Sequence, residues 1–485
     1  MERYNPILRT EIFPLCVDLD GTIVETDTFI ECLIVGIRKW SVLSRIPRWV
    51  IEGKAKLKQE LACHVKLDPA LLPYNGSLLQ YLHHQKNLGR RLFLVTAANK
   101  QIAEAVKNHL GIFEEVIASS TSHNLRGEEK AKVLVERFGN RKFSYVGNDL
   151  TDLHVWKHAY SGVLVNTQNV IATRASDLTM IEKRFDKDKP RRVKALVRSL
   201  RPHQWVKNLL VFVPIITAKA FGDFGSLFNA FLLFVAFCSI ASGVYVLNDL
   251  FDLEADRQHP TKRERPFASG RLSIASGFAM VPILFCTGLI FSFSTKVPAA
   301  AELLLLYLTI TIAYSLKLKE FPLVDVFTLS ALYTIRLFAG GEVTNYHVSF
   351  WLIAFSGFVF LALAIIKRTS ELKTMTDGQK LHVPRRGYSH EDLHVIQIFG
   401  IASTFVSSIV LALYIQSHAA ADIYYRPQIL WLLVPVILFW QCRLWLSVTR
   451  GYMDDDPIVY SAKDWVSWVV GLIVAATLFT ASIRI

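Results

Sequence analysis

The sequence predicts two fold classes in one chain: an α/β domain built on a parallel sheet with a small helical cap, followed by an all-α polytopic membrane domain of nine transmembrane helices. Strand-like and helix-like segments alternate over the first part of the chain, up to about residue 185. Apolar runs of near membrane-spanning length fill the later part. We therefore expect three regions, at residues 1–185, 186–205 (a basic linker) and 206–485.

Composition supports a membrane protein and argues against a nucleic-acid binder. The chain has 485 residues, of which 52% are hydrophobic, and a formal net charge of +13. Such an excess is typical of basic cytoplasmic loops and of contact with anionic lipid, and no nucleic-acid-binding motif is present. The six cysteines have neither metal-ligand nor disulfide spacing, and residues 1–15 lack the pattern of a signal peptide. The α/β domain is therefore expected in the cytosol.

Three apolar segments of the first region end in polar side chains. They lie at 15–22, 91–96 and 143–152, and helical patterns lie between the last two at 100–110 and 129–138. Strands that alternate with helices indicate a parallel sheet covered on both faces. Because ligands of such sheets gather at the carboxyl ends of the strands, the polar residues there form a candidate site.

The residue types at these strand ends are suited to phosphoryl transfer. Asp18 can attack phosphorus, and Asp20 can protonate the leaving oxygen and then activate water. Thr96 can donate to phosphoryl oxygens, and Lys130 can balance their charge. The carboxylates predicted to hold Mg²⁺ are Asp18, Asp20 and Asp149, with Asp152 as a further candidate.

The D-x-D-G-T sequence at 18–22, followed in order by the threonine, lysine and aspartate just named, resembles the haloacid dehalogenase superfamily over residues 12–180. The resemblance implies a Rossmann-like fold, with the helical region 30–89 as a small cap. It also implies a Mg²⁺-dependent phosphatase. The alternative is a degenerate domain that is kept for assembly.

The linker and the apolar runs predict how the chain meets the membrane. Lysine and arginine crowd the linker, which is either a solvated helix or an interfacial helix on anionic lipid. Nine apolar runs follow, at 207–221, 227–247, 275–294, 298–315, 321–341, 350–367, 394–416, 428–446 and 465–482. Basic residues concentrate in every second connection, so the positive-inside rule assigns these loops and the α/β domain to the cytosol. We expect a multi-pass protein of the inner (plasma) membrane whose C-terminus lies on the opposite side.

An acidic stretch at 248–256 directly follows the second apolar run. On a helix, Asp249, Asp252 and Asp256 share one face, and Asn248 adds a further oxygen ligand. Carboxylates at the end of a membrane helix are costly without a cation, and Mg²⁺ bound to a diphosphate supplies one. A group of cations follows at once: Arg257, Lys262, Arg263, Arg265 and Arg271. These residue types predict a joint site for metal and phosphate, with a solvated acidic loop as the alternative.

Further polar residues are predicted at the same membrane face. They are Lys207, Asn208, Tyr314, Lys319 and Asp325, with Lys367 and Arg368 at the end of the sixth run, and Arg443, Asp454, Asp455 and Asp456 after the eighth. Arg336 lies inside the fifth run, and an ionisable residue at membrane depth is a candidate for function. We expect Arg336 to bind phosphate; a structural ion pair is the alternative.

The asparagine-led acidic motif and the nine apolar runs resemble the UbiA superfamily of intramembrane prenyltransferases over residues 198–485. Within it, segments 201–208, 259–266 and 450–457 look like those of decaprenyl-phosphate phosphoribosyltransferases. This implies transfer of 5-phosphoribose from phosphoribosyl diphosphate to a polyprenyl phosphate. The implied catalytic Mg²⁺ ligands are Asp249, Asp252 and Asp256, and the implied substrate-binding residues are Lys207, Asn208, Asn248, Lys262, Arg263, Arg265, Tyr314, Lys319, Asp325 and Arg336. The fused phosphatase would remove the 5-phosphate and leave polyprenyl-phosphoryl-ribose.

Two other functions stay open at this point. An aromatic or quinone prenyltransferase, with a regulatory soluble domain, is disfavoured because such relatives have a second aspartate four residues after Asp325, where this chain has Leu329. A transporter is disfavoured because no internal repeat is evident and the charged residues gather at one membrane face. The prenyl chain length is left open, as is whether the protein forms a homo-oligomer.

Overall fold

The computed structural model of the chain describes residues 13–119, 125–186, 189–376, 387–453 and 456–483. It contains two compact units, of which one comprises Met1–Ser199 with Val246–Met280 and the other Leu200–Tyr245 with Val281–Ile485. The stretch with the acidic motif is therefore part of the same unit as the α/β domain. Part of the predicted basic linker, and both Asp454 and Asp455, lie outside the described residues.

A six-stranded parallel sheet forms the centre of the first unit. Its strands are β1 (Leu15–Val17), β2 (Leu92–Asn99), β3 (Glu115–Ser119), β4 (Ser144–Gly147), β5 (Ser161–Val165) and β6 (Met180–Phe185). Their order is β3-β2-β1-β4-β5-β6, and every neighbouring pair is parallel. The direction of winding reverses between β1 and β4, which is where doubly wound sheets bind their ligands. The predicted parallel α/β fold is confirmed.

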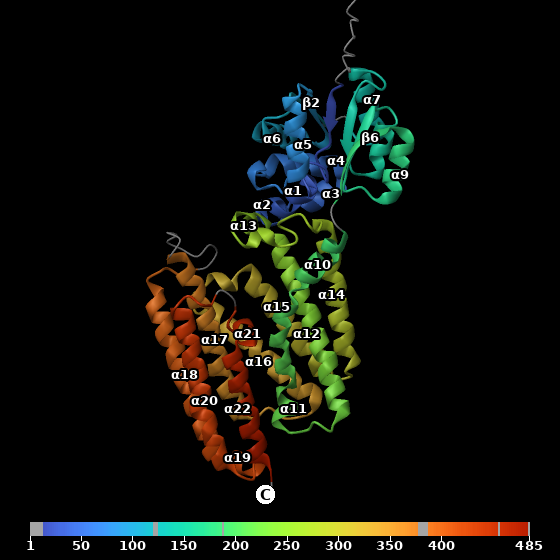
Figure 1. Ribbon diagram of the computed structural model, residues 1–485. Helices are drawn as coiled ribbons and strands as arrows, with labels where there is room; N and C mark the ends of the chain where they lie inside the picture. The colour runs from blue at the N-terminus through green and yellow to red at the C-terminus, as the bar shows by residue number, and fades with distance from the viewer. Residues whose placement is uncertain (1–12, 120–124, 187–188, 377–386, 454–455, 484–485) are drawn as a thin grey trace, which may run out of the picture. The chain divides into compact units, whose positions relative to one another are not determined.

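Alternate side chains of the strands enter two separate cores, one on each face of the sheet. The covering helices are α5 (Gly76–Asn87), α6 (Lys100–Leu110), α7 (Glu128–Phe138), α8 (Leu153–Trp156) and α9 (Asn169–Leu178). Leu15 and Val17 join the core under α5 and α6, whereas Cys16 joins the core under α7, α8 and α9. Figure 1 shows four of these helices beside the sheet, α5 and α6 in blue and α7 and α9 in blue-green.

A small helical cap with its own core lies between β1 and α5 in the chain. It consists of α1 (Thr28–Ile37), α2 (Trp40–Leu43), α3 (Ile46–Ile51) and α4 (Lys54–His64), and η1 (Pro69–Leu71) follows it. Cys32, Val42, Trp49, Leu61 and Val65 form its buried core. The cap is shorter than the sequence predicts, because α5 packs on the sheet and not on the cap.

The remaining part of the first unit contains the acidic motif. Its elements are α10 (Lys189–Leu200), the end of α12 (Phe224–Phe251), α13 (Leu253–Gln258), η4 (Lys262–Glu264) and the start of α14 (Ile274–Ser294), whereas η2 (Leu150–Asp152) belongs to the α/β domain, between β4 and α8. The helical path is interrupted between α12 and α13 at Asp252, whose ψ of 15° departs from helical geometry. The acidic motif is therefore shared between two helices.

Seven helices of the described residues are long and apolar enough to cross a membrane. They are Phe224–Phe251 (α12), Ile274–Ser294 (α14), Pro298–Leu316 (α15), Phe350–Lys373 (in α17, Phe350–Thr376), Asp392–Gln416 (α18), Pro427–Thr449 (η6, Pro427–Leu432, with α20, Leu433–Thr449) and Trp465–Ser482 (α22). The predicted number of nine is not confirmed. The run at 207–221 forms η3 (Pro202–Phe212) and the short α11 (Val213–Thr217), and the run at 321–341 forms α16 (Val324–Thr344). α16 has the length of a span, but Asp325, Arg336 and Glu342 make it more polar than the seven.

α16 connects two cores of the second unit. One joins α16 to η3, α11, α12 and α15, and the other joins it to α17, α18 and α20. A third core lies among α18, α19 (His418–Ile423), α20 and α22, and the short η5 (Leu318–Glu320) and α21 (Pro457–Lys463) complete the unit. Gly340 lets α16 approach η3 closely, because a Cβ there would lie 2.2 Å from the carbonyl oxygen of Val211. The charged residues of α16 are thus held on both sides by packed helices.

Candidate functional site

The carboxyl ends of β1, β2 and β4 bring the predicted phosphatase residues to one edge of the sheet. Asp18 directly follows β1, Thr96 lies in the second half of β2, and Asp149 follows β4. Asp18 and Thr96 are buried, whereas Asp149 is exposed. Lys130, in the first turn of α7, reaches this edge and places its Nζ 3.0 Å from Asp18 Oδ1. The predicted nucleophile and its counter-charge are therefore adjacent.

A chain of hydrogen bonds holds Lys130 in place. Its Nζ donates to Asp18 Oδ1 at 3.0 Å and to the Tyr145 hydroxyl at 2.8 Å, and that hydroxyl donates to Asp152 Oδ1 at 2.8 Å. The other oxygen of Asp152 accepts from two backbone N–H groups of the loop after β4, at 2.9 and 3.0 Å. Burial lowers the pKa of Lys130, but Asp18 and Asp152 raise it by more, so its ammonium stays charged. Asp152 thus anchors this loop and Lys130.

Asp20 has a different environment from Asp18. Its Oδ1 accepts from the backbone N–H of Thr28 at 2.8 Å. Burial, with the charge of Asp27 as the next cause, raises the pKa of Asp20 to about 7. Burial also raises the pKa of Asp18 to about 6, against the opposing effect of Lys130. Since a general acid works best with a pKa near the working pH, Asp20 is suited to hold the proton for the leaving oxygen.

The donor set at this edge fits Mg²⁺. The raised pKa values of Asp18 and Asp20 show that the surrounding protein groups do not fully compensate these buried carboxylates. Mg²⁺ takes one or two carboxylates and completes its shell with phosphate oxygens and water. Among the described residues no group of three or more Asp, Glu, His or Cys side chains is arranged as a metal site, so Mg²⁺ binding by Asp18, Asp20 and Asp149 together stays a prediction. Asp149, the third predicted ligand, caps η2 by accepting from the backbone N–H of Leu150 at 2.7 Å.

Arg265 brings two carboxylates of the acidic motif together. Its NH1 lies 3.2 Å from Asp249 Oδ1 and 2.7 Å from Asp256 Oδ2. Asp249 and Asp256 are buried, while Asp252 and Asn248 are half-buried. Burial raises the pKa of Asp256 although Arg265 opposes the shift. Carboxylates bind Mg²⁺ and guanidinium groups bind phosphate, so the residue types suit the predicted site. In this structure Arg265 contacts an oxygen of Asp249 and of Asp256, and the described residues hold no group of three or more carboxylates arranged as a metal site, so Mg²⁺ binding here stays a prediction.

The other cations that follow the motif differ in their surroundings. Lys262 and Arg263 are exposed on η4. Arg271 forms an exposed ion pair with Glu264 at 2.7 Å. Arg257 instead forms a buried ion pair with a glutamate of the α/β domain, Glu31, at 2.6 Å. The five predicted cations therefore differ in burial and in partners: Arg257 and Arg271 pair with glutamates, and Arg265 pairs with carboxylates of the motif.

In the second unit, one carboxylate binds two lysines. Asp456 Oδ2 lies 2.6 Å from Lys207 Nζ and 3.2 Å from Lys367 Nζ. Lys207 belongs to η3, Lys367 to α17, and Asp456 precedes α21. Lys207 was predicted as a site residue, whereas Lys367 and Asp456 were only noted at the ends of apolar runs. The sequence indicated only that Lys367 and Asp456 lie at the same membrane face as Lys207. No sequence pattern predicts that Asp456 pairs with the two lysines.

Arg336 is buried in α16 and is bound by neutral groups. Its Nε donates to Asn208 Oδ1 at 2.7 Å, and its NH2 donates to the Tyr307 hydroxyl at 2.9 Å. The guanidinium also lies 4.5 Å from the centroid of the Tyr307 ring. Within the described part of the chain Arg336 forms no ion pair. A buried guanidinium that is hydrogen-bonded only to neutral groups is a candidate anion-binding group.

Asp325 is enclosed by two partners at the start of α16. Arg368 NH2 lies 2.6 Å from Asp325 Oδ2, and the Tyr388 hydroxyl donates to Oδ1 at 2.5 Å. Neither Asp325 nor Arg368 has exposed side-chain surface. Arg368 and Tyr388 were not among the predicted site residues. Tyr314, near the end of α15, and Lys319, in η5, are both half-buried.

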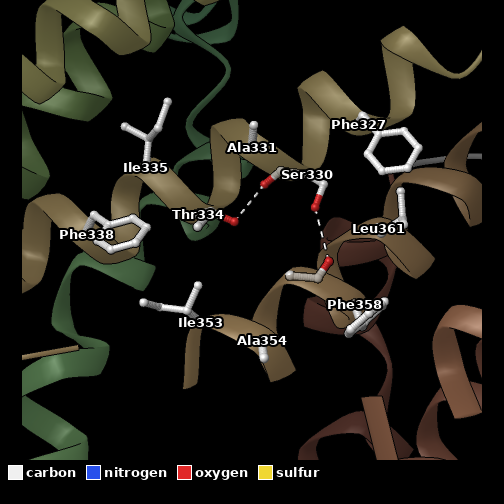
Figure 2. A pocket seen from close by; sticks show the side chains of 11 residues that line it. Phe327, Ser330, Ala331, Thr334, Ile335, Phe338, Ile353, Ala354, Phe358 and Leu361 are labelled. Atoms are coloured by element: carbon white, nitrogen blue, oxygen red, sulfur yellow. Dashed lines mark hydrogen bonds between the residues drawn. The ribbon is translucent and has the colours of Figure 1, made fainter. Parts of the chain in front are cut away.

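An apolar groove lies between α16 and α17 (Figure 2). Its volume is about 510 Å³, and it is lined by Phe327, Ser330, Ala331, Thr334, Ile335, Phe338, Ile353, Ala354, Gly357, Phe358 and Leu361. The two hydroxyls in the lining donate within the protein, Ser330 to the carbonyl of Gly357 at 3.2 Å and Thr334 to the carbonyl of Ser330 at 3.1 Å. The groove therefore presents mainly hydrocarbon surface, which suits an apolar chain.

Both parts of the chain are similar to known proteins. Residues 209–463 match the UbiA prenyltransferase family, and residues 15–156 match the haloacid dehalogenase-like hydrolases. The uncharacterized protein y4nM of Sinorhizobium fredii is 33% identical over 96% of this chain and 91% of its own length. The nodulation protein NoeC of Azorhizobium caulinodans is 34% identical over 56% of this chain and 87% of its own length.

A third relative is named for a reaction. Decaprenyl-phosphate phosphoribosyltransferase of Corynebacterium glutamicum is 33% identical over 43% of this chain and 63% of its own length. The similarity expected from the sequence is thereby confirmed for both halves. The chain belongs to the UbiA prenyltransferase family, and it carries a haloacid dehalogenase-like domain ahead of its membrane helices.

Proposed function

We propose that this protein transfers 5-phosphoribose from phosphoribosyl diphosphate to a polyprenyl phosphate, and that its soluble domain then removes the 5-phosphate. The observation that carries the transfer is Arg336, whose buried guanidinium is held by the neutral Asn208 and Tyr307. Its charge is available for an anionic substrate. The relative named decaprenyl-phosphate phosphoribosyltransferase supports this substrate class.

In the transfer step, an oxygen of the acceptor phosphate attacks C1 of the ribose, and the bond from C1 to the diphosphate oxygen breaks. The acceptor is already an anion, so the residues position it and no strong base is required. Asp249, Asp252 and Asp256 would hold Mg²⁺, and the bound ion would supply positive charge for the diphosphate oxygens. Arg265 lies against two of these carboxylates and would bind diphosphate oxygens, together with Lys262 and Arg263. The prenyl chain would occupy the apolar groove between α16 and α17.

In the second step, Asp18 attacks the 5-phosphate and the bond from phosphorus to the ribose oxygen breaks. Asp20 gives its proton to that oxygen and later takes a proton from the water that hydrolyses the aspartyl-phosphate. Lys130, 3.0 Å from Asp18, balances the phosphoryl charge, and Thr96 donates to a phosphoryl oxygen. The products are polyprenyl-phosphoryl-ribose and inorganic phosphate.

The test uses purified full-length protein with ribose-labelled phosphoribosyl diphosphate, Mg²⁺ and a polyprenyl phosphate. We expect label to move into the lipid phase in a form that lacks the 5-phosphate. Arg336→Met should reduce this transfer roughly 10–100-fold, because a charge-assisted contact to phosphate is lost. If no label moves, the transferase proposal is wrong, and a prenyl diphosphate with an aromatic acceptor becomes the next substrate pair to assay.

Asp18→Asn separates the two steps. We expect normal transfer of label to lipid but retention of the 5-phosphate, because the variant lacks the nucleophile of the second step. The measurement is release of inorganic phosphate alongside chromatography of the labelled lipid. Phosphate release that survives in Asp18→Asn would refute the role of the soluble domain and leave the transferase proposal standing.

A further inference from the structure

A buried ion pair joins the cap of the phosphatase-like domain to the helix of the acidic motif. Glu31 lies in α1 and Arg257 lies in α13, and both belong to the first compact unit. The contact is bidentate, with 2.6 Å from NH2 to Oε1 and 3.1 Å from NH1 to Oε2. The side chains are only 7% and 3% exposed for Arg257 and Glu31. The two residues are 226 positions apart, so only folding brings them together.

Each residue of this pair lies in a segment that contains a predicted catalytic group. On one side, Glu31 Oε1 accepts from the Thr26 hydroxyl at 2.8 Å, and the backbone N–H of Thr28 donates to Asp20 at 2.8 Å. The segment from Asp20 to Glu31 is thus held by its own hydrogen bonds. On the other side, Arg257 directly follows Asp256 in α13.

Other contacts place the acidic motif and the residues after it, up to Gly270, beside the segment that contains Glu31. Arg38 NH1 donates to the carbonyl oxygen of Phe251, the last residue of α12, at 3.0 Å. A Cβ added at Gly270 would lie 2.8 Å from the Cβ of Glu25 and 3.4 Å from that of Pro73. Arg257 Nε also donates to the carbonyl of Ala268 at 3.0 Å, which links α13 to its own loop. The acidic motif and the loop after it therefore rest on residues 20–38 of the soluble domain.

A buried ion pair is a weak source of net stability, because desolvation offsets most of the attraction. Its well-attested use is to select one register among alternative packings. We propose that Glu31 and Arg257 are positioning residues that set the register of α13, and so of Asp256 and Arg265, on the soluble domain. The transferase motif would then depend on the phosphatase-like domain for its geometry. The importance of that geometry for transfer rests on the proposed function.

Crosslinking tests the register without any enzymatic assay. Glu25→Cys and Gly270→Cys are introduced together, with a specific protease site between residues 186 and 189, so that a crosslink keeps the two fragments joined after cleavage. Disulfide-linked Cβ atoms lie about 3.8 Å apart, and a short bismaleimide provides a second reagent. Because Gly270 has φ +68°, its cysteine is strained, so every rate is compared with that of the double-cysteine protein that carries no further substitution. The single-cysteine variants measure the background from the native cysteines.

The crosslink should form quickly in the protein that carries only Glu25→Cys and Gly270→Cys. It should form about tenfold more slowly when Glu31→Gln or Arg257→Met is added to this protein. Glu264→Gln, which breaks the exposed pair with Arg271 in the same loop, is the matched control and should leave the rate unchanged. An equal crosslinking rate in Arg257→Met would overturn the proposal, and this holds whether or not the protein transfers phosphoribose.

A double-mutant cycle then measures the effect on transfer. Glu31→Gln and Arg257→Met should each raise KM for phosphoribosyl diphosphate about tenfold, and the double variant should add little to either. Arg257→Lys should recover part of the loss, because it restores charge without the bidentate geometry. Independent effects that multiply in the double variant would show that the two residues do not act as a pair. If wild-type protein shows no transfer, the proposed function fails and the crosslinking result still decides the register.

Discussion

Asp456 compensates two ammonium groups in the second unit, that of the buried Lys207 and that of the half-buried Lys367. Burial raises its pKa, but Lys207 and Lys367 lower it by more, so the pKa of Asp456 lies well below its usual value. The lysines lie 2.6 and 3.2 Å from the same carboxylate oxygen. Removing one partner of such a group leaves an uncompensated buried charge, which costs more than the pair itself contributes.

We expect Asp456→Asn to reduce the free energy of unfolding by about 3 kcal/mol. Asparagine keeps the size of the side chain and the capping oxygen that accepts from the N–H of Ile458 at 3.2 Å, so the loss reports mainly on charge. The measurement is thermal unfolding of the detergent-solubilised protein. Asp422→Asn, at an exposed position of α19, is the control. Equal melting temperatures for Asp456→Asn and wild type would contradict the role assigned to this carboxylate.

Gly21 is required by the turn between the two aspartates proposed to be catalytic, Asp18 and Asp20, and the cap. Its φ is +73°, and a Cβ there would lie 2.2 Å from Asn148 Nδ2 in the loop after β4. We expect Gly21→Ala to lower phosphate release from p-nitrophenyl phosphate at least about tenfold, because both strain and the clash displace Asp20. Gly111→Ala is the matched control, since Gly111 has φ +62° with nothing within 4 Å of the added Cβ. Similar losses in both variants would indicate general destabilisation.

At the level of elements, the edge strand β6 pairs with β5 along its backbone, and one glutamate of β6 adds side-chain contacts to the rest of the domain. Glu182 forms a bidentate pair with Arg90 at 2.9 Å and also accepts from the hydroxyls of Tyr81 and Ser161. Burial raises the pKa of Glu182, but these donors and the charge of Arg90 lower it by more, to about 2. A carboxylate with a lowered folded-state pKa stabilises the protein above its unfolded pKa. That contribution is lost as the pH falls toward the folded value.

The pH dependence of the free energy of unfolding follows from the lowered pKa of Glu182. Above pH 4.5 we expect wild type to exceed Glu182→Gln by about 2 kcal/mol in free energy of unfolding, a figure reduced for partial exposure. The difference should shrink as the pH falls from 4.5 toward 2. Chemical denaturation followed by tryptophan fluorescence measures it, with Glu136→Gln in α7 as the baseline for removing an exposed carboxylate. A difference that stays constant across this range would mean that ionisation of Glu182 is not the cause.

At the scale of the whole molecule, the charges of the connections predict the membrane topology. Basic residues lie in alternate loops, so we propose that the α/β domain is cytosolic and that the C-terminus is on the opposite side. Alkaline phosphatase fused after Ile485 should therefore be active in cells, and green fluorescent protein fused there should be dark. Fusions within residues 377–386, where the sequence is basic, should give the reverse pattern. Fluorescence at the C-terminus would contradict an odd number of spans.

Much of the α/β fold could be predicted because its signals are local. Helix α6 has the predicted bounds, and α7 differs from its prediction by one residue. The D-x-D-G-T sequence follows β1 directly, so parallel pairing alone was sufficient to place Asp18 near the ends of β2 and β4. The cap boundary could not be predicted in this way. α5 has the same helical pattern as the cap helices, and only packing assigns it to the sheet.

The sequence by itself determined that a parallel α/β domain precedes a set of apolar helices, and which strand ends and helix ends carry charge, because periodicity and neighbouring motif residues are properties of short segments. Only the tertiary structure decided which charges meet. It paired Arg257 with Glu31 and Asp456 with Lys207 and Lys367, and it surrounded Arg336 with neutral groups. These partners come from segments far apart in the chain, and long-range packing, which no local pattern encodes, brings them within hydrogen-bonding distance.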